Sequence, residues 1–172
     1  MRRFAIKNTL VATISLALVF SLSGCGAGPN AATRLINQVT DGAEAKVRNA
    51  DSDLMIANFL LVATEDGSAV VVGTIINRAP REDALLGIKV GDAIATITGQ
   101  QNLPQNEPIR FEGDIATSKA VFAGVGAEPG KNVSVTLAFA VAGEVNLTAI
   151  IRDKRDDYAN ITTDSNFATV TE

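Results

Sequence analysis

The sequence contains no histidine and no tryptophan, and its 172 residues include one cysteine and one tyrosine. Without histidine, the chain cannot form a Ser-His-Asp or Cys-His catalytic arrangement, and it cannot supply the imidazole ligands of common zinc and copper sites. With one cysteine, no disulfide can form within the chain. Stability must therefore come from an ordinary apolar core, which a chain of this length can build.

The one cysteine, Cys25, follows an N-terminal segment with the pattern of an export signal. Arg2, Arg3 and Lys7 precede an apolar, uncharged run over residues 10–22. This run is shorter than the roughly 20 residues of a membrane span. Its length and its basic flank are typical of a secretory signal peptide.

The sequence at the end of this run, Leu-Ser-Gly-Cys, matches the lipobox of bacterial lipoproteins. We therefore predict a signal peptide over residues 1–24, cleavage between Gly24 and Cys25, and a lipid-bearing Cys25 whose thiol accepts diacylglycerol. More than one acyl chain gives stable anchoring to membrane lipid. The alternative is an ordinary signal peptide with an accidental cysteine. Residues 25–32 are small and predict a flexible tether.

The predicted mature chain is acidic. Three of the 15 basic residues lie in the predicted signal peptide and all 19 acidic residues follow it, so 12 basic and 19 acidic residues leave a net charge of −7. A negatively charged domain is poorly suited to bind the phosphate backbone of nucleic acid. We therefore predict no nucleic-acid partner.

The mature chain has the pattern of short β-strands. Apolar and polar residues alternate over residues 132–141 and again over 145–151, which predicts a hairpin. Residues 54–64 and 69–77 form an earlier predicted pair. The Asp66-Gly67 dipeptide between them favours a tight turn.

Further short strands are predicted at five places, over residues 33–39, 43–47, 93–98, 109–112 and 119–125. Residues 83–86 are predicted to form a helical turn. Regularly spaced short strands with turn signals indicate an all-β protein with an antiparallel, Ig-like β-sandwich. We expect the sandwich over residues 33–152 and a polar, loosely ordered tail over residues 153–172.

Two stretches, residues 77–90 (NRAPREDALLGIKV) and 127–148 (AEPGKNVSVTLAFAVAGEVNLT), resemble the periplasmic copper chaperone (PCuAC) family. In that family an Asn closing a strand is followed by an acidic residue and Leu, and a Pro/Gly turn leads into the final hairpin. The likeness covers roughly residues 54–152. It implies a cupredoxin-like β-sandwich.

The resemblance also marks where this chain departs from the family, whose members hold Cu(I) through two His and two Met. In place of their H-x-M element this chain has Lys119-Ala-Val121. Residues 99–110 stand where the first His and Met should be, and they contain neither. Soft imidazole and thioether ligands select copper, and the mature chain retains only Met55. We therefore predict no metal site and no cofactor.

The lipobox, the small tether, the sandwich and the missing ligands together resemble the actinobacterial lipoproteins of the LpqE type. That group is found beside the respiratory cytochrome bc–cytochrome oxidase supercomplex, on the outer face of the cytoplasmic membrane. The resemblance implies a membrane-anchored, non-enzymatic accessory subunit of that complex. Two alternatives stay open: a divergent periplasmic copper chaperone or oxidase assembly factor, and an enzyme acting on envelope glycans.

Two surfaces are candidates for contact with a partner protein. One is the amide-rich loop over residues 99–110, since long loops on a rigid sandwich often carry binding. Its candidate residues are Gln100, Gln101, Asn102, Leu103 and Pro104. The other is the tail, whose aromatic residues are Tyr158 and Phe167, because aromatic anchors favour docking. The alternative for the loop is a plain solvated connection.

Overall fold

The computed structural model describes residues 41–164. The predicted signal peptide, Gly24, Cys25, the predicted strand at 33–39 and Phe167 lie outside the described residues. Within residues 41–164 the chain forms eleven β-strands and one short 3-10 helix. The elements are β1 (Ala43–Arg48), β2 (Asp53–Ala63), β3 (Ala69–Asn77), β4 (Asp83–Val90), β5 (Ala93–Ile94), β6 (Thr96–Gly99), β7 (Asn102–Leu103), β8 (Ile109–Phe111), β9 (Ser118–Phe122), β10 (Asn132–Phe139), β11 (Gly143–Arg152) and η1 (Asp156–Tyr158).

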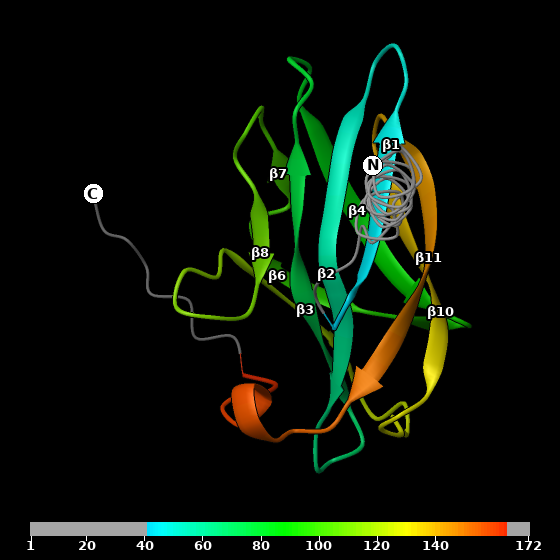
Figure 1. Cartoon of the computed structure of the whole chain (residues 1–172), viewed down its shortest axis with the longest axis vertical. Coiled ribbons are helices and arrows are strands. Elements are labelled where there is room, and N and C mark those ends of the chain that lie inside the picture. The colour runs from blue at the N-terminus through cyan, green and yellow to red at the C-terminus, as the bar shows by residue number, and fades with distance from the viewer. Residues whose placement is uncertain (1–40, 165–172) are drawn as a thin grey trace, which may run out of the picture. The chain divides into compact units, whose positions relative to one another are not determined.

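The strands form a β-sandwich whose two layers belong to one hydrogen-bonded path. β5, β4, β10 and β11 form one layer, and β2, β3, β8, β9 and β6 form the other. β11 joins the layers, because it pairs antiparallel with β10 and, at Ile151 and Arg152, parallel with β2. Figure 1 shows β4 passing behind β2 and β3. The two ends of this hydrogen-bonded path are β5 and β6. These strands follow each other in the chain with only the buried residue Ala95 between them, so the sheet is nearly closed.

Both predicted hairpins are present. All of β10 pairs with β11, from Asn132 opposite Ile150 to Phe139 opposite Gly143. β2 and β3 pair on either side of the turn at residues 64–68. Their apolar faces meet between the layers and form the main core. Its largest fully buried side chains include Phe59, Phe111, Phe122, Leu54, Ile56, Leu61, Ile75, Leu85, Ile88, Leu103 and Ile109.

The predicted helical turn at residues 83–86 is wrong, because β4 begins at Asp83 and is paired with β10. Asp83 is 4% exposed, and its carboxylate accepts a hydrogen bond from the N–H of Ala84 (2.8 Å). It also accepts from the N–H groups of Val141 (2.8 Å) and Ala142 (3.0 Å) in the turn between β10 and β11. These bonds fasten the start of β4 to the neighbouring hairpin and hold it extended.

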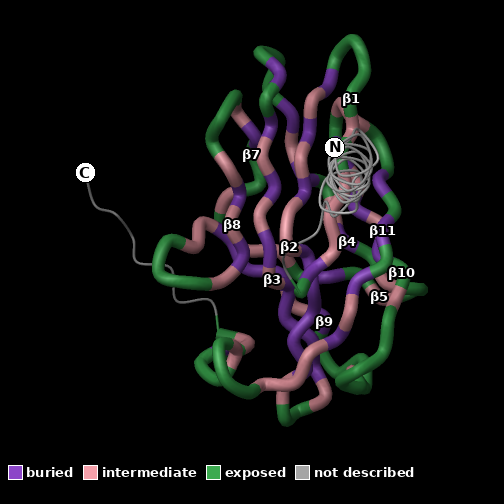
Figure 2. The backbone as a smooth tube through the Cα atoms, in the orientation of Figure 1, coloured by how far each residue is buried: buried purple, intermediate pink, exposed green. Residues whose placement is uncertain are grey.

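The second half of β2 is buried on both faces. The register against β3 shifts at Asn58, whose φ is 51°, and every residue from Phe59 to Ala63 is buried. On one face these residues join the main core. On the other face, Leu60 and Val62 belong to a cluster with Ile161 of the C-terminal segment. Figure 2 shows buried backbone gathered in the strands and exposed backbone in the loops.

The expectation of a loosely ordered tail is wrong as far as Asp164. After β11 the chain forms η1. Ile161 follows, is 7% exposed and packs with Leu60 and Val62 of β2 and Val70 of β3, outside the main core. Apolar surface of these strands is thereby removed from water, which offsets the entropy lost in ordering the segment. Within residues 41–164 no helix is long and apolar enough to cross a membrane.

Candidate functional site

The amide-rich loop at residues 99–110 is fastened to the sandwich. Its β7 segment pairs with β4, Asn102 opposite Ala84 and Leu103 opposite Asp83. Leu103 is 0% exposed and its side chain belongs to the main core. The prediction of Leu103 as a partner contact is therefore wrong, because this side chain anchors the loop from inside.

The buried side chain of Asn77 holds the same loop from the end of β3. Its Nδ2 donates to the carbonyl oxygens of Leu103 (2.9 Å) and Arg81 (2.7 Å), and its Oδ1 accepts from the N–H of Ala79 (3.0 Å). The Asn77 carbonyl accepts from the N–H of Asn106 (2.7 Å). The Asn77 side chain thus links the loop after β3 to the loop at residues 99–110, which is a structural reason for an Asn at this position.

The other candidate residues of the loop remain at the surface. Gln101 and Asn102 are exposed, whereas Gln100 and Pro104 are half-buried. The Gln100 side chain donates to the carbonyl of Asn102 (2.9 Å). The loop therefore presents polar groups on a fixed backbone, and their contact with a partner protein stays a prediction.

Lys119 lies at the start of β9, where the family resemblance expects the first residue of the H-x-M element. Its side chain is buried, and its Nζ lies 2.9 Å from Oε1 of Glu112. The same Nζ donates to the carbonyl oxygen of Thr162 in the tail (2.5 Å). An ammonium engaged in this way has donors only and no lone pair to offer a metal.

No sequence pattern singles out Glu112. It follows β8 directly and has a φ of 65°, a conformation that few residues other than glycine adopt. This backbone turn is invisible in the sequence. The signal that points to an acidic partner is Lys119 itself, since a lysine inside an apolar strand must find an anion when it is buried.

Two other residues that matter for a Cu(I) site, Val121 and Met55, also contact other parts of the chain. Val121, the last residue of the H-x-M place, packs against the cluster that contains Leu60 and Ile161. The sulfur of Met55 accepts a hydrogen bond from Nη2 of Arg78 (3.0 Å). Among residues 41–164, no group of three or more His, Cys, Asp or Glu side chains is placed to hold a metal ion. The side chains present do not fit an imidazole and thioether site.

Tyr158, the first predicted aromatic anchor, is half-buried beside the cluster around Ile161. Burial raises the pKa of its phenol, and the nearby carboxylate of Asp41 acts in the same direction. Part of the ring is therefore already used against the chain's own sheet. The second predicted anchor, Phe167, and the predicted lipidation site, Cys25, lie outside the described residues.

Solved PCuAC domains share this fold. The apo PCuAC domain from PmoF1 matches with a TM-score of 0.52 and 27% sequence identity, over 64% of this chain and 99% of that domain. The copper-bound PCuAC domain from PmoF2 matches with a TM-score of 0.54 and 21% identity, over 64% of this chain and 98% of that domain, and shows the fold alone. No protein-family model and no curated protein matches the chain. The likeness confirms the cupredoxin-like β-sandwich and supports a relation to the PCuAC family.

Proposed function

We propose that the protein is a non-catalytic, lipid-anchored domain of the cell envelope that serves a respiratory oxidase by binding rather than by chemistry. The likeness to PCuAC domains supports the non-catalytic part. The anchor at Cys25, the outer face of the cytoplasmic membrane and the respiratory partner are supported by the lipobox and by the resemblance to LpqE-type lipoproteins. The anchor would raise the effective concentration of the domain near membrane partners, so a modest interface would suffice.

Two forms of this proposal differ in what the domain binds. In the first form it handles copper for oxidase assembly. The likeness to the apo PCuAC domain from PmoF1, at 27% identity, favours this form, because PCuAC domains are copper-chaperone domains. In the second form it is an accessory subunit of the cytochrome bc–cytochrome oxidase supercomplex, as the LpqE-type resemblance implies.

The geometry around Lys119 supports the second form. At the place of the H-x-M element, the amine of Lys119 engages Glu112 and the carbonyl of Thr162. This part of β9 therefore holds the tail against the sandwich and offers no soft ligand. What the loop at residues 99–110 presents to a neighbour is a set of exposed amides, which suit a protein contact.

Co-purification tests the accessory role. A tagged cytochrome oxidase is isolated from native membranes in mild detergent, and the protein is quantified against oxidase subunits by mass spectrometry. We expect a fixed ratio to the supercomplex and its loss in a Cys25→Ser strain. Absence from a well-populated supercomplex would remove this role.

Competition titration tests the copper role. The purified protein competes with a Cu(I) chelator of known affinity, and Met55→Leu is compared with the parent chain. The copper form requires tight one-to-one uptake that Met55→Leu weakens. The accessory form predicts weak uptake that the substitution leaves unchanged.

A further inference from the structure

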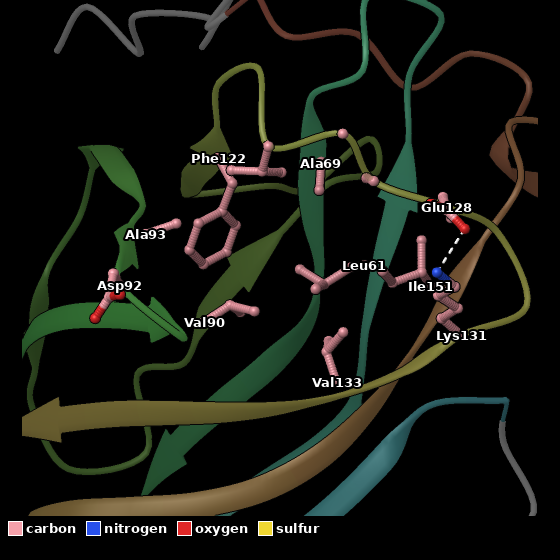
Figure 3. Close-up of a pocket in the computed structure, with 13 residues that line it drawn as sticks. Leu61, Ala69, Val90, Asp92, Ala93, Phe122, Glu128, Lys131, Val133 and Ile151 are labelled. Carbon is pink, nitrogen blue, oxygen red and sulfur yellow. Dashed lines mark ion pairs between the residues drawn. The ribbon is translucent and has the colours of Figure 1, made fainter.

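A cavity of about 360 Å³ opens at one end of the sandwich. Its walls come from both layers and are apolar, with Leu61, Val90, Phe122, Val133 and Ile151 around the space (Figure 3). The volume lies within the range of small-molecule pockets, about 300–1,000 Å³. The proposed oxidase role makes no use of this cavity.

The loop between β9 and β10, residues 123–131, borders the mouth of the cavity. Three of its glycines have left-handed backbone, with φ between 59° and 87°. The loop is fastened by the N–H groups of Gly124 (to the Ser68 hydroxyl, 3.1 Å), Ala127 and Gly130. A short loop held at a few points can open and admit a ligand without unpairing a strand.

Charged side chains stand on opposite sides of the mouth (Figure 3). On one side, Glu128 and Lys131 form an ion pair with 2.6 Å between Oε2 and Nζ. On the other side is Asp92, which has no ion pair or hydrogen bond within residues 41–164. Because the paired charges cancel, Asp92 gives the mouth a net negative charge. Val125, 42% exposed, adds an apolar rim.

We propose that this cavity binds one small amphiphile, with its apolar chain or ring between the layers and a cationic head at Asp92. The apolar walls favour the chain, because its burial removes apolar surface from water. The unpaired carboxylate of Asp92 attracts an ammonium group and repels a free carboxylate or phosphate. The few polar groups at the mouth thus select the head, while the walls provide the affinity.

Calorimetric titration tests the proposal with decylamine and decanoate below their micelle concentrations and with decanol below its solubility limit. The protein carries Cys25→Ser, so that the acyl chain predicted there cannot compete. We expect saturable one-to-one binding of decylamine, weaker binding of decanol and the weakest binding of decanoate. Shorter amines should bind about fourfold more weakly for each methylene removed.

Variants locate the binding site. Val133→Phe fills part of the cavity and should weaken decylamine binding by roughly tenfold or more. If the larger side chain keeps two methylene groups of the ligand out of the cavity, binding already weakens by about that factor. Ala127→Leu does the same from the loop after β9, at a half-buried position that packs against the main core. Asp92→Asn should weaken decylamine binding by up to about fivefold and leave decanol unchanged. Asp114→Asn, an exposed carboxylate outside the cavity, is the matched control.

Three results would overturn the proposal: no saturable decylamine binding, binding that neither cavity-filling variant weakens, or an equal effect of Asp92→Asn and Asp114→Asn. If decanoate binds as tightly as decylamine, the proposed preference for a cationic head group at Asp92 is wrong. The oxidase role is tested by co-purification and copper titration, so either proposal can fail without the other.

Discussion

Lys119 and Glu112 form an ion pair that is almost enclosed, with 2.9 Å between Nζ and Oε1 and side chains that are 9% and 14% exposed. Because Nζ also donates to the carbonyl of Thr162, one amine joins β9, the segment after β8 and the tail. Burying two charges costs desolvation energy that their attraction only partly offsets, so such a pair adds little net stability. Removing one partner, however, leaves the other charge uncompensated.

Lys119→Met should therefore destabilise the protein by about 3 kcal/mol, since the Glu112 carboxylate is left without a cation. Urea unfolding followed by circular dichroism measures the loss. The double variant Lys119→Met, Glu112→Leu should recover most of it, because no unpaired charge remains.

The exposed pair of Lys131 and Glu128 is the matched control, with side chains 62% and 66% exposed. Lys131→Met should cost less than about 1 kcal/mol, because solvent screens this pair. Equal losses in Lys119→Met and Lys131→Met would contradict the structural role of the enclosed pair.

Asp83→Asn should destabilise the protein by about 2 kcal/mol, although the two side chains have the same shape. The carboxylate accepts from three backbone N–H groups, two of them on the β10–β11 turn. An amide replaces one acceptor by a donor, so at least one N–H loses its partner. Urea unfolding is the measurement. Asp114→Asn, at an exposed site, should stay within about 0.5 kcal/mol of the parent.

Asn77→Asp tests how the amide-rich loop is held. A carboxylate cannot donate to the carbonyls of Leu103 and Arg81, which Nδ2 does now. Hydrogen exchange in residues 99–110 should therefore become faster, and stability should fall by about 2 kcal/mol. Unchanged exchange in this loop would show that β7 pairing and buried Leu103 hold it without Asn77.

The strand pattern was predictable because alternation is a local property of the sequence. In β10 and β11 the apolar residues recur at every second position, and the structure pairs these strands as expected. Asp83 shows where local reasoning fails. Its partners, Val141 and Ala142, are almost 60 residues away in the chain, and no local pattern records such a contact.

The candidate site was less predictable than the fold, for the same reason. The pairing of Lys119 with Glu112 depends on a positive φ at Glu112, and backbone of that kind has no sequence signal at a glutamate. The burial of Leu103 follows from its pairing with β4. For β2 a signal existed: the unbroken apolar run Phe-Leu-Leu-Val-Ala over residues 59–63 is typical of a strand covered on both faces.

Acid should weaken the β2–β3 turn through Asp66. Hydrogen bonds from the Thr64 hydroxyl and from the N–H and hydroxyl of Ser68 hold the pKa of Asp66 below its ordinary value of 3.8. A lowered pKa in the folded state stabilises the fold above the unfolded pKa and loses that contribution as the pH falls through the folded pKa. Below about pH 4, the parent should lose stability more steeply than Asp66→Asn, as measured by urea unfolding at a series of pH values. Parallel curves would contradict this role.

The tail should open without unfolding the sandwich. Ile161 packs on Leu60, Val62 and Val70, outside the main core between the layers. Ile161→Ala removes most of this contact and should cost about 2 kcal/mol locally, because residues 153–164 can detach while the strands stay paired. Exchange of amides in that segment should therefore rise far more than exchange in β10 and β11. Asn160→Ala, at an exposed neighbour, is the control and should change neither. A uniform rise in exchange across all strands would instead mean that the tail and the sandwich unfold as one unit.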